Sequence, residues 1–197
     1  MDEVKLQIAR EEAAACGASN VEFHSLDFRQ HAADGTYDVV YARFLLTHLP
    51  DPASAGRAFF DYVRPGGIVA VEDIDFSGNF TFPPSPAAER YSELYVATVL
   101  RRGADPNIGP KLPSLLIDAG FADVGVAVVQ PVGLTGEAKL LNPITMQGIA
   151  DAVVADDLAS REEIDRLVEE LFSFAADPRT LAGLPRVVQA WGRRPAS

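Results

Sequence analysis

The sequence contains a single cysteine, Cys16, so one chain cannot form an internal disulfide bond. This usage suits a reducing compartment, and we therefore expect a cytoplasmic protein. No apolar run reaches the roughly 18 residues that a membrane span needs. The first residues are acidic and are not followed by the apolar core of a signal peptide. These absences predict a protein that is neither secreted nor inserted in a membrane.

Positive charge is also scarce, because 17 Lys and Arg residues stand against 28 Asp and Glu residues, a net charge of −11. Nucleic acids bind basic surfaces, so we expect no nucleic-acid partner. With 48% hydrophobic and 23% charged residues, the 197-residue chain has the composition of a folded globular protein. Its length predicts a single domain over residues 1–197 with some elaboration.

Glycines are never separated by one residue, so the chain has no Gly-x-Gly loop of the kind that binds phosphates or nucleotides. This excludes a P-loop and a nicotinamide-binding Rossmann turn within these 197 residues. Gly66 and Gly67 follow Pro65 directly, and this order predicts a turn that leads into a strand.

Apolar, β-branched runs alternate with helical patterns along the chain. The run over residues 37–42 is almost continuously apolar, which predicts a strand buried on both faces and paired in parallel. We expect five strands, over residues 21–26, 37–42, 68–71, 121–132 and 186–191. We expect helices over residues 3–16, 87–102 and 109–119. Three further helices are expected to begin at Asp51-Pro52, Asn142-Pro143 and Ser160. This alternation predicts an α/β fold with a mostly parallel sheet.

The chain divides into an α/β core over residues 1–75, a helical substrate-side part over residues 76–120, and a last part over residues 121–197. The last part holds the final two strands and a helical insertion at about residues 138–178. Because helices precede the final strand, we expect it to run antiparallel beside residues 122–131, with Arg193 and Arg194 at its exposed end. Ser160 and Glu163 have the spacing of a capping box.

Ligands of parallel α/β sheets bind outside the carboxyl ends of the strands, which directs attention to residues placed there. Asp27 either accepts a hydrogen bond from an adenine amino group, with Phe28 covering the ring, or is an ordinary turn aspartate. Arg43 either binds the carboxylate of a cofactor or an anionic substrate, or pairs with Asp38 or Asp51 at the surface.

Further polar residues follow the predicted strands. Because alternate strand residues point to opposite faces, Glu72 and Asp73 should diverge, and we expect no metal site there. They would instead contact a substrate or cap a loop, as would Asp75. His48 either acts as a general base or hydrogen-bonds a loop carbonyl and holds the turn.

Five short motifs follow one another over residues 2–75. They are Val4-Lys5-Leu6 with Ala9-Arg10, Asn20-Val21-Glu22-Phe23 with Asp27, Tyr37-Asp38-Val39-Val40, His48-Leu49, and Val63-Arg64-Pro65-Gly66-Gly67 leading into Glu72-Asp73. In this order they resemble the class I S-adenosylmethionine-dependent methyltransferases of the UbiE-like, small-molecule type. Residues 90–91, 102–109 and 119–121 resemble the downstream part of one bacterial branch of that family.

The resemblance implies a Rossmann-like methyltransferase sheet, S-adenosylmethionine as cofactor, and methyl transfer to a small organic acceptor. It places Asp27 at the acid that binds the adenine amino group, with Phe28 beside it. Ala42 and Arg43 match the segment that lines the methionine end of the cofactor. Methyl transfer in this family depends largely on positioning, and no catalytic residue is assigned.

The family's glycine-rich motif and its ribose-binding acid normally precede the part that this sequence matches. The resemblance therefore implies an N-terminally incomplete sheet, and we expect residues 1–197 to bind S-adenosylmethionine poorly or not at all. The alternative is a non-catalytic methyltransferase-like protein that acts through a partner or a second copy, which would cover exposed strand edges. Six aromatic residues either indicate an apolar acceptor or fill the core: Phe44, Phe76, Phe80, Phe82, Tyr91 and Tyr95.

Overall fold

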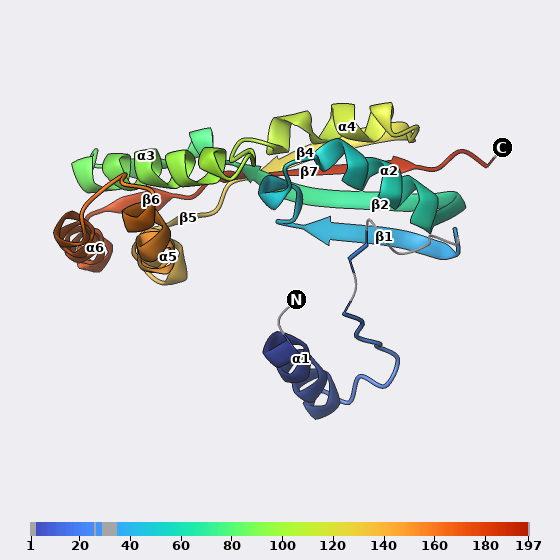
Figure 1. The fold of residues 1–197 in the computed structure, drawn as a ribbon, viewed down its shortest axis with the longest axis horizontal. Helices are drawn as coiled ribbons and strands as arrows, with labels where there is room; N and C mark the ends of the chain where they lie inside the picture. Colours follow the sequence, from blue (N-terminus) through green and yellow to red (C-terminus); the bar gives the residue numbers. More distant parts are fainter. Residues whose placement is uncertain (1–2, 26, 29–34, 197) are drawn as a thin grey trace. The chain divides into compact units, whose positions relative to one another are not determined.

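The computed structural model describes residues 3–25, 27–28 and 35–196. These residues belong to two units, Met1–Asp34 and Gly35–Ser197, each described by itself (Figure 1). In the first unit, α1 (Glu3–Ala15) confirms the helix predicted over residues 3–16. Gly17 follows it with a φ of 71°, a left-handed conformation that glycine adopts without strain. The single domain expected over residues 1–197 stays a prediction.

The strand predicted over residues 21–26 is wrong for residues 21–25, which have no regular secondary structure, and Leu26 lies outside the described residues. A strand depends on backbone hydrogen bonds to a neighbouring strand. Among the described residues, no strand pairs with this segment. The carbonyl oxygen of Phe23 instead accepts a hydrogen bond from Nη2 of Arg10 at 3.4 Å.

Four strands form the main sheet of the second unit, in the order β1-β2-β7-β4 (Figure 1). β1 (Tyr37–Arg43) runs parallel to β2 (Val63–Asp75). β7 (Arg186–Arg193) lies between β2 and β4 (Ala122–Val129) and is antiparallel to both. The predicted Rossmann-like sheet with an antiparallel last strand is therefore confirmed, as is the pairing of the final strand with residues 122–131.

Two helices cover one face of this sheet. α2 (Pro52–Tyr62) packs against β1 and β2, and α4 (Leu112–Asp118) packs against β7 and β4 (Figure 1). α2 begins where predicted, since the Asp51 side chain accepts a hydrogen bond from the backbone of Ser54. The buried side chains of these helices and strands include Ala55, Phe59, Leu112, Leu116, Val69, Val71, Val188 and Ala190.

Burial of β1 on both faces was predicted and is wrong. Tyr37, Val39 and Tyr41 are 54%, 57% and 56% exposed, whereas Ala42 is buried. β1 is an edge strand of the described sheet, and α2 covers only the other face of it. The apolar run thus indicated the parallel pairing correctly, but not how much of the strand is covered.

Beyond β2 the chain forms a second, mainly helical part. It contains η2 (Phe76–Gly78), β3 (Phe80–Phe82), α3 (Pro86–Arg101) and η3 (Gly109–Lys111), which leads into α4. α3 is capped by Ser85, whose side chain accepts a hydrogen bond from the backbone of Ala88. The helices predicted over residues 87–102 and 109–119 are confirmed, although the first turn of the second is a 3-10 helix.

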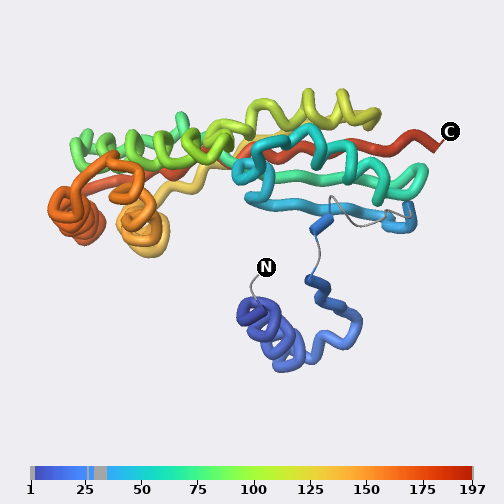
Figure 2. Tube along the Cα trace, in the orientation of Figure 1, coloured from blue at the N-terminus to red at the C-terminus, as the bar shows by residue number. Residues whose placement is uncertain are grey.

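The last part of the chain adds two helices and a small sheet. α5 (Glu137–Ala155) and α6 (Arg161–Ala176) pack against α3 and confirm the helical insertion predicted at about residues 138–178 (Figure 2). β5 (Val132–Gly133) and β6 (Leu181–Gly183) pair with β3 in the order β3-β6-β5. The buried core of this part includes Tyr91, Leu94, Met146, Val153, Ile164 and Leu167.

Two predicted boundaries in this region are wrong. α5 begins at Glu137 and continues through Pro143, so Asn142-Pro143 is not its start. Proline normally disfavours a helix interior, but the Pro143 side chain is buried in the packed face of α5. The strand predicted over residues 121–132 divides into β4 and β5, so this part of the chain has four strands rather than two.

The predicted capping box of α6 forms in one half. The Ser160 hydroxyl accepts a hydrogen bond from the backbone of Glu163 at 3.1 Å. The Glu163 carboxylate does not return to Ser160, because it accepts a hydrogen bond from Nε of Arg90 at 2.9 Å. This contact connects α6 to α3.

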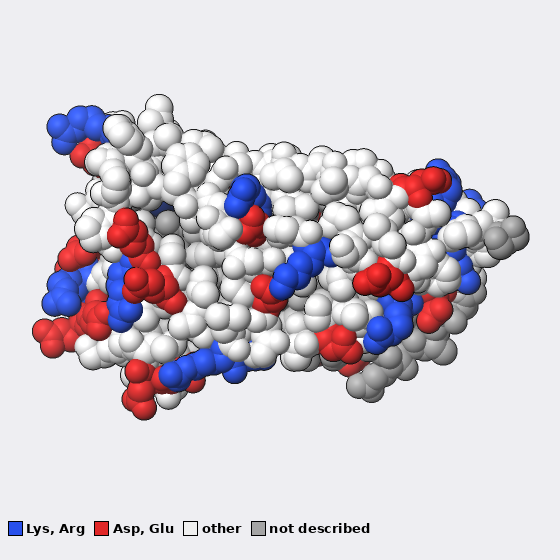
Figure 3. All heavy atoms as spheres, turned by 90° about the horizontal axis from the view of Figure 1, so that it is seen from above, with Lys and Arg blue, Asp and Glu red and all other residues white. Residues whose placement is uncertain are grey.

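The arginines after β7 differ from each other. Arg193 is exposed as predicted, but Arg194 is half-buried. Its guanidinium donates to the backbone oxygens of Phe60 and Val63 at 2.7 and 2.8 Å, which contradicts the exposed position predicted for it. On the face seen in Figure 3, basic side chains lie beside acidic ones. Within the described part of the chain, no helix combines the length and apolar character that crossing a bilayer requires.

Candidate functional site

The carboxyl ends of β1 and β2 form one edge of the sheet. Their parallel register pairs Ala42 with Val71 and Arg43 with Glu72. η1 (Leu46–His48) follows β1, and η2 follows β2. The structure therefore brings Ala42, Arg43 and the Glu72-Asp73 pair together at the strand ends where ligands of such sheets bind.

Glu72 and Asp73 point to opposite faces, as predicted. The Tyr41 hydroxyl donates a hydrogen bond to Oε1 of Glu72 at 2.6 Å, across β1 and β2. This hydrogen bond, together with one from Gln189, holds the pKa of the Glu72 carboxyl below its usual value. Glu72 therefore belongs to a polar row on the face of the sheet away from α2.

Asp73 is fully buried and holds the loop after β1. Its carboxylate accepts hydrogen bonds from the backbone of Thr47 at 3.0 Å and of Ile74 at 2.9 Å. Burial raises the pKa of Asp73, and the backbone hydrogen bonds and His48 oppose that rise. The Thr47 hydroxyl donates in turn to the Asp105 carbonyl oxygen at 3.0 Å. Of the two predicted roles, the loop-capping one describes these contacts.

Arg43 pairs with neither of the carboxylates that were considered for it. The Asp38 carboxylate forms an ion pair with the Arg64 guanidinium at 2.6 Å, and the Asp51 carboxylate lies 3.8 Å from the Arg57 guanidinium. Among the residues that the structure describes, no carboxylate forms a salt bridge with Arg43. The surface-pairing alternative is therefore wrong for both aspartates.

The exposed guanidinium of Arg43 instead lies over the ring of Phe44, 4.7 Å from its centre. Phe44 has a φ of 50°, which turns the chain sharply at the end of β1. Its backbone N–H donates to the Glu72 carbonyl oxygen at 2.9 Å and so extends the pairing with β2. The turn places at the edge of the sheet a cation that forms no salt bridge with a described carboxylate, although its charge contributes to the lowered pKa of Glu72.

His48 is exposed at the end of η1, and its backbone N–H donates to the Leu45 carbonyl oxygen at 3.1 Å. The predicted hydrogen bond from the imidazole to a loop carbonyl is not found with any residue in the described ranges. An electrostatic interaction with His48 opposes, without cancelling, the rise that burial causes in the pKa of Asp73. The general-base alternative stays a prediction.

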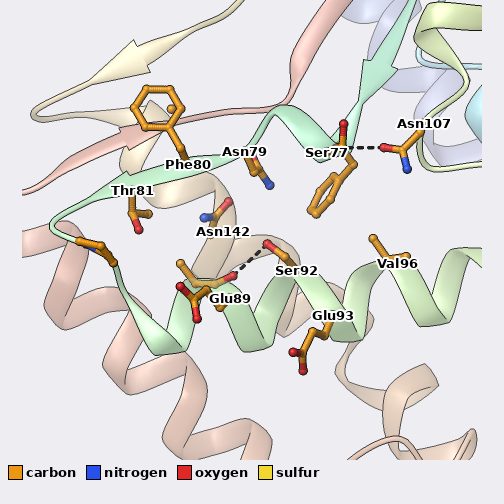
Figure 4. A pocket seen from close by; sticks show the side chains of 14 residues that line it. Ser77, Asn79, Phe80, Thr81, Glu89, Ser92, Glu93, Val96, Asn107 and Asn142 are labelled. Carbon is orange, nitrogen blue, oxygen red and sulfur yellow. Dashed lines mark hydrogen bonds between the residues drawn. The ribbon is translucent and has the colours of Figure 1, made fainter.

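A cavity of about 770 Å³ opens beyond the carboxyl end of β2 (Figure 4). It lies in the part predicted to face the substrate, between the η2–β3 segment, α3 and α5. Its lining consists of Phe76, Ser77, Asn79, Phe80, Thr81, Pro84, Ala88, Glu89, Ser92, Glu93, Val96, Asn107, Asn142 and Gly183.

The six aromatic residues divide between the two alternatives considered for them. Phe76 and Phe80 line the cavity, and Tyr95 stacks on Phe76 with ring centres 4.2 Å apart. Tyr91 is buried in the helical core, where burial raises its pKa. Phe44 and Phe82 are exposed. Only part of the set therefore contributes to an apolar cavity.

Two asparagines in the cavity were not singled out from the sequence. Nδ2 and Oδ1 of Asn79 and Oδ1 of Asn142 are buried, and none has a hydrogen-bond partner among the described residues. Asn79 follows Gly78 and is typical of a turn, and Asn142 precedes a proline, so neither carried a signal of its own. Only the packing of α5 against α3 and β6, the strand that pairs with β3, places them at one cavity.

The other predicted cofactor residues, Asp27 and Phe28, lie in the first unit, where both are half-buried. The strand expected before Asp27 is absent from residues 21–25, so its predicted position at a strand end is wrong. In the described ranges, no three His, Cys, Asp or Glu side chains converge as metal ligands would.

The sequence model of a family described as a methyltransferase domain matches residues 1–101. This chain belongs to the methyltransferase family. The match covers the five motifs and extends through α3. The resemblance to class I methyltransferases is thereby confirmed.

Two relatives show how much of a known protein the chain covers. Methyltransferase str3 of Strobilurus tenacellus is 30% identical over 148 residues, which is 71% of this chain and 53% of that protein. Phosphoethanolamine N-methyltransferase 1 of Arabidopsis thaliana is 34% identical over 120 residues, 60% of this chain and 22% of that protein. The chain thus spans about half of the first relative and about a fifth of the second.

Solved structures support the fold. A Bacillus halodurans C-125 protein assigned to the methyltransferases has a TM-score of 0.62 at 18% identity, over 99% of this chain and 80% of that one. Phosphoethanolamine N-methyltransferase 2 of Haemonchus contortus, solved with phosphomonomethylethanolamine and S-adenosylhomocysteine, has a TM-score of 0.53 at 18% identity. The similarity covers 96% of this chain and 41% of the Haemonchus protein.

Proposed function

We propose that this protein transfers the methyl group of S-adenosylmethionine to a small organic acceptor held in the cavity beyond β2. The family supports the reaction type, and the cavity is the observation that carries the proposal. Its volume of about 770 Å³ falls within the roughly 300–1,000 Å³ that is usual for small-molecule sites. The cavity lies after β2, the strand whose end lies beside Arg43.

The residues present fit the methionine end of the cofactor. The Arg43 guanidinium, which has no salt bridge to a described residue, would bind the cofactor carboxylate, and the small Ala42 side chain would leave space beside it. Asp27 would accept a hydrogen bond from the adenine amino group, with Phe28 against the ring. When bound, S-adenosylmethionine supplies a methyl group on a positively charged sulfur.

No side chain is assigned a proton-transfer role. The chain's contribution would be to orient the acceptor and exclude water, which accelerates a two-reactant step by making it effectively intramolecular. Phe76, Phe80 and Val96 provide apolar walls for this purpose. The buried Asp73 would keep the η1 loop in place next to the strand ends.

The proposal is tested by titrating S-adenosylmethionine into the protein and following amide chemical shifts by NMR, which detects millimolar affinities. We expect Asp27→Ala and Arg43→Ala each to weaken binding about 5- to 150-fold, the equivalent of roughly 1–3 kcal/mol. Arg57→Ala removes an exposed arginine of α2 and should leave the affinity unchanged. Absence of binding at millimolar cofactor, or equal affinities in all variants, would overturn the proposal.

The two relatives described above are both named as methyltransferases and lend no support to the non-catalytic alternative. A homo-oligomer, a cytoplasmic location, the lack of a metal and the lack of a nucleic-acid partner stay predictions.

A further inference from the structure

We infer that the cavity beyond β2 selects an acceptor without negative charge, one that carries a neutral hydrogen-bonding group beside an apolar body. Phosphate esters and carboxylates would be excluded. The inference rests on the proposed function only in calling the bound molecule the methyl acceptor, because the selectivity is a property of the cavity itself.

The charges around the cavity oppose an anion. None of the described lining residues is Lys, Arg or His, whereas Glu89 and Glu93 both lie on the α3 side. Glu93 is paired with Arg90 at 3.1 Å, but no salt bridge to a described residue involves Glu89. Anion sites in proteins normally supply arginine, lysine or a cluster of free backbone N–H groups.

Two arginines that contact lining residues are already held in ion pairs. Arg90 pairs with Glu163 at 2.9 Å as well as with Glu93. Arg186, which reaches the lining residue Ser77, is held by Asp75 at 2.8 Å. Neither guanidinium is therefore available to a phosphate without breaking an ion pair.

The first turn of α3 borders the cavity and would otherwise attract an anion. Ser85 occupies the backbone N–H groups that would bind such an anion. Its hydroxyl accepts a hydrogen bond from the Ala88 backbone, and its carbonyl oxygen accepts one from the Glu89 backbone. Glu89 also places a carboxylate in this turn, where it compensates the helix dipole. A second negative charge would be repelled.

Asn79 and Asn142 favour a neutral ligand group that forms hydrogen bonds. They reach the cavity from opposite elements, the η2–β3 segment and α5, and Figure 4 shows both between that segment and α3. Their unpartnered amide atoms include both a donor and acceptors, and buried polar groups are costly when unpaired. Side-chain rotation toward a ligand that both donates and accepts would satisfy them, as an amide or hydroxyl does.

The apolar part of the ligand would contact the aromatic wall. Phe76 and Phe80 line the cavity, and Val96 and Ala88 face them from α3. This composition distinguishes the cavity from what the names of some relatives suggest. Phosphoethanolamine, which the Arabidopsis relative is named for, carries a phosphate that no lining residue here would neutralise.

Four probes of similar size that differ in charge test the inference: 2-phenylacetamide, phenethylamine, phenylacetate and phenyl phosphate. Each is titrated into the full chain at neutral pH and followed by NMR. We expect the amide and the amine to bind at least tenfold more tightly than either anion, with shifts at residues of η2, β3 and α3. Anions that bind equally or better, or no binding by any probe, would overturn the inference.

Variants identify the residues responsible. Asn79→Leu and Asn142→Leu should each weaken the amide at least fivefold, and Glu89→Gln should weaken the amine while leaving the amide unchanged. Gln147→Leu, on the same helix as Asn142 but outside the lining, is the matched control. If the asparagine variants bind the amide as well as the original protein does, the assignment is wrong.

The probe titrations need no cofactor, so the two proposals can fail separately. The expected probe order without binding of S-adenosylmethionine would overturn only the methyl-transfer proposal. Cofactor binding together with a preference for anions would overturn only the selectivity.

Discussion

Asp73 illustrates at the scale of single residues how a buried charge can hold a loop. Its carboxylate is 0% exposed and accepts hydrogen bonds from two backbone N–H groups, one in η1 and one in β2. Removing the acceptor would leave two buried donors unpaired.

We therefore expect Asp73→Ala to lower the free energy of unfolding by about 2–4 kcal/mol, since each unpaired buried donor costs roughly 1–3 kcal/mol. Asp73→Asn keeps one acceptor oxygen and should lose less. Urea denaturation followed by circular dichroism measures both values. An unchanged unfolding midpoint for Asp73→Ala would show that the carboxylate does not support the loop.

The pH dependence of Asp73 has a defined sign. Because burial raises the pKa of this acid above its ordinary value of 3.8, the native state holds the proton more tightly than the unfolded state. The contribution to stability is full below 3.8 and is lost as the pH rises through the native pKa. Asp73→Asn should abolish that decrease in the measured unfolding free energy between pH 3 and the native pKa.

The hydrogen bond from Tyr41 to Glu72 gives a pH dependence of stability opposite in sign to that of Asp73. It lowers the pKa of Glu72 below the ordinary value of 4.5, so its stabilisation is present above pH 4.5 and is lost as the pH falls through the native pKa. Tyr41→Phe should reduce the unfolding free energy at pH 7 only slightly, because solvent screens an interaction at so exposed a pair. A difference from the original protein that persists undiminished at pH 3 would contradict this assignment.

At the scale of elements, η3 is the segment through which the helical part packs against the main sheet. It contacts both β2 and β7, and Gly109 begins it. A Cβ at Gly109 would lie 2.9 Å from the Ile74 carbonyl oxygen and 2.9 Å from Cγ2 of Val188. The backbone of β2 cannot move away easily, because it is paired on both sides.

Gly109→Ala should therefore destabilise the protein by about 1–3 kcal/mol, the usual effect of overpacking. Gly148→Ala is the matched control, since Gly148 is an exposed residue within α5 and a Cβ there meets nothing within 4 Å. That control should stabilise the protein by about 0.5–1 kcal/mol through helix propensity. Thermal unfolding of the two variants measures both changes in melting temperature. Equal changes in the two variants would refute the close approach of η3 to β2 and β7.

At the scale of the whole molecule, stability should be greatest in the centre of the main sheet. β2 and β7 each have a strand on both sides and contain fully buried residues, whereas β1 and β4 are the edge strands of the sheet that the described residues form. Amides that exchange only through global unfolding are expected where pairing and burial coincide.

Hydrogen exchange should accordingly be slowest at Val69, Val71, Val188 and Ala190, and faster by at least about tenfold at the outer amides of β1 and β4. Residues 18–25, which have no strand or helix, should exchange fastest. Mass spectrometry of peptides from labelled protein provides the measurement. Greater protection in β1 than in β2 would indicate that the exposed face of β1 is covered in solution.

Local sequence was sufficient for much of the fold. α2 and α6 begin at the predicted caps Asp51 and Ser160, and β1 and β2 contain the predicted apolar runs, although β2 begins at Val63 and includes the turn predicted at Pro65-Gly66-Gly67. Helix caps act within one turn, and β-branched apolar runs favour strands over a few residues, so both effects can be recognised without knowing the fold. The order of the motifs also indicated the family.

Tertiary contacts decided the remainder. Residues 21–25 have strand-like composition but no lateral partner among the described residues, and Pro143 is accommodated because α5 buries it. The candidate site depends on the same long-range contacts, since Asn79 and Asn142 line one cavity only after α5 packs against α3 and against β6, which pairs with β3. Periodicity reports which residues prefer burial, whereas the partner that buries or pairs each segment comes from distant parts of the chain, so only the folded structure determines it.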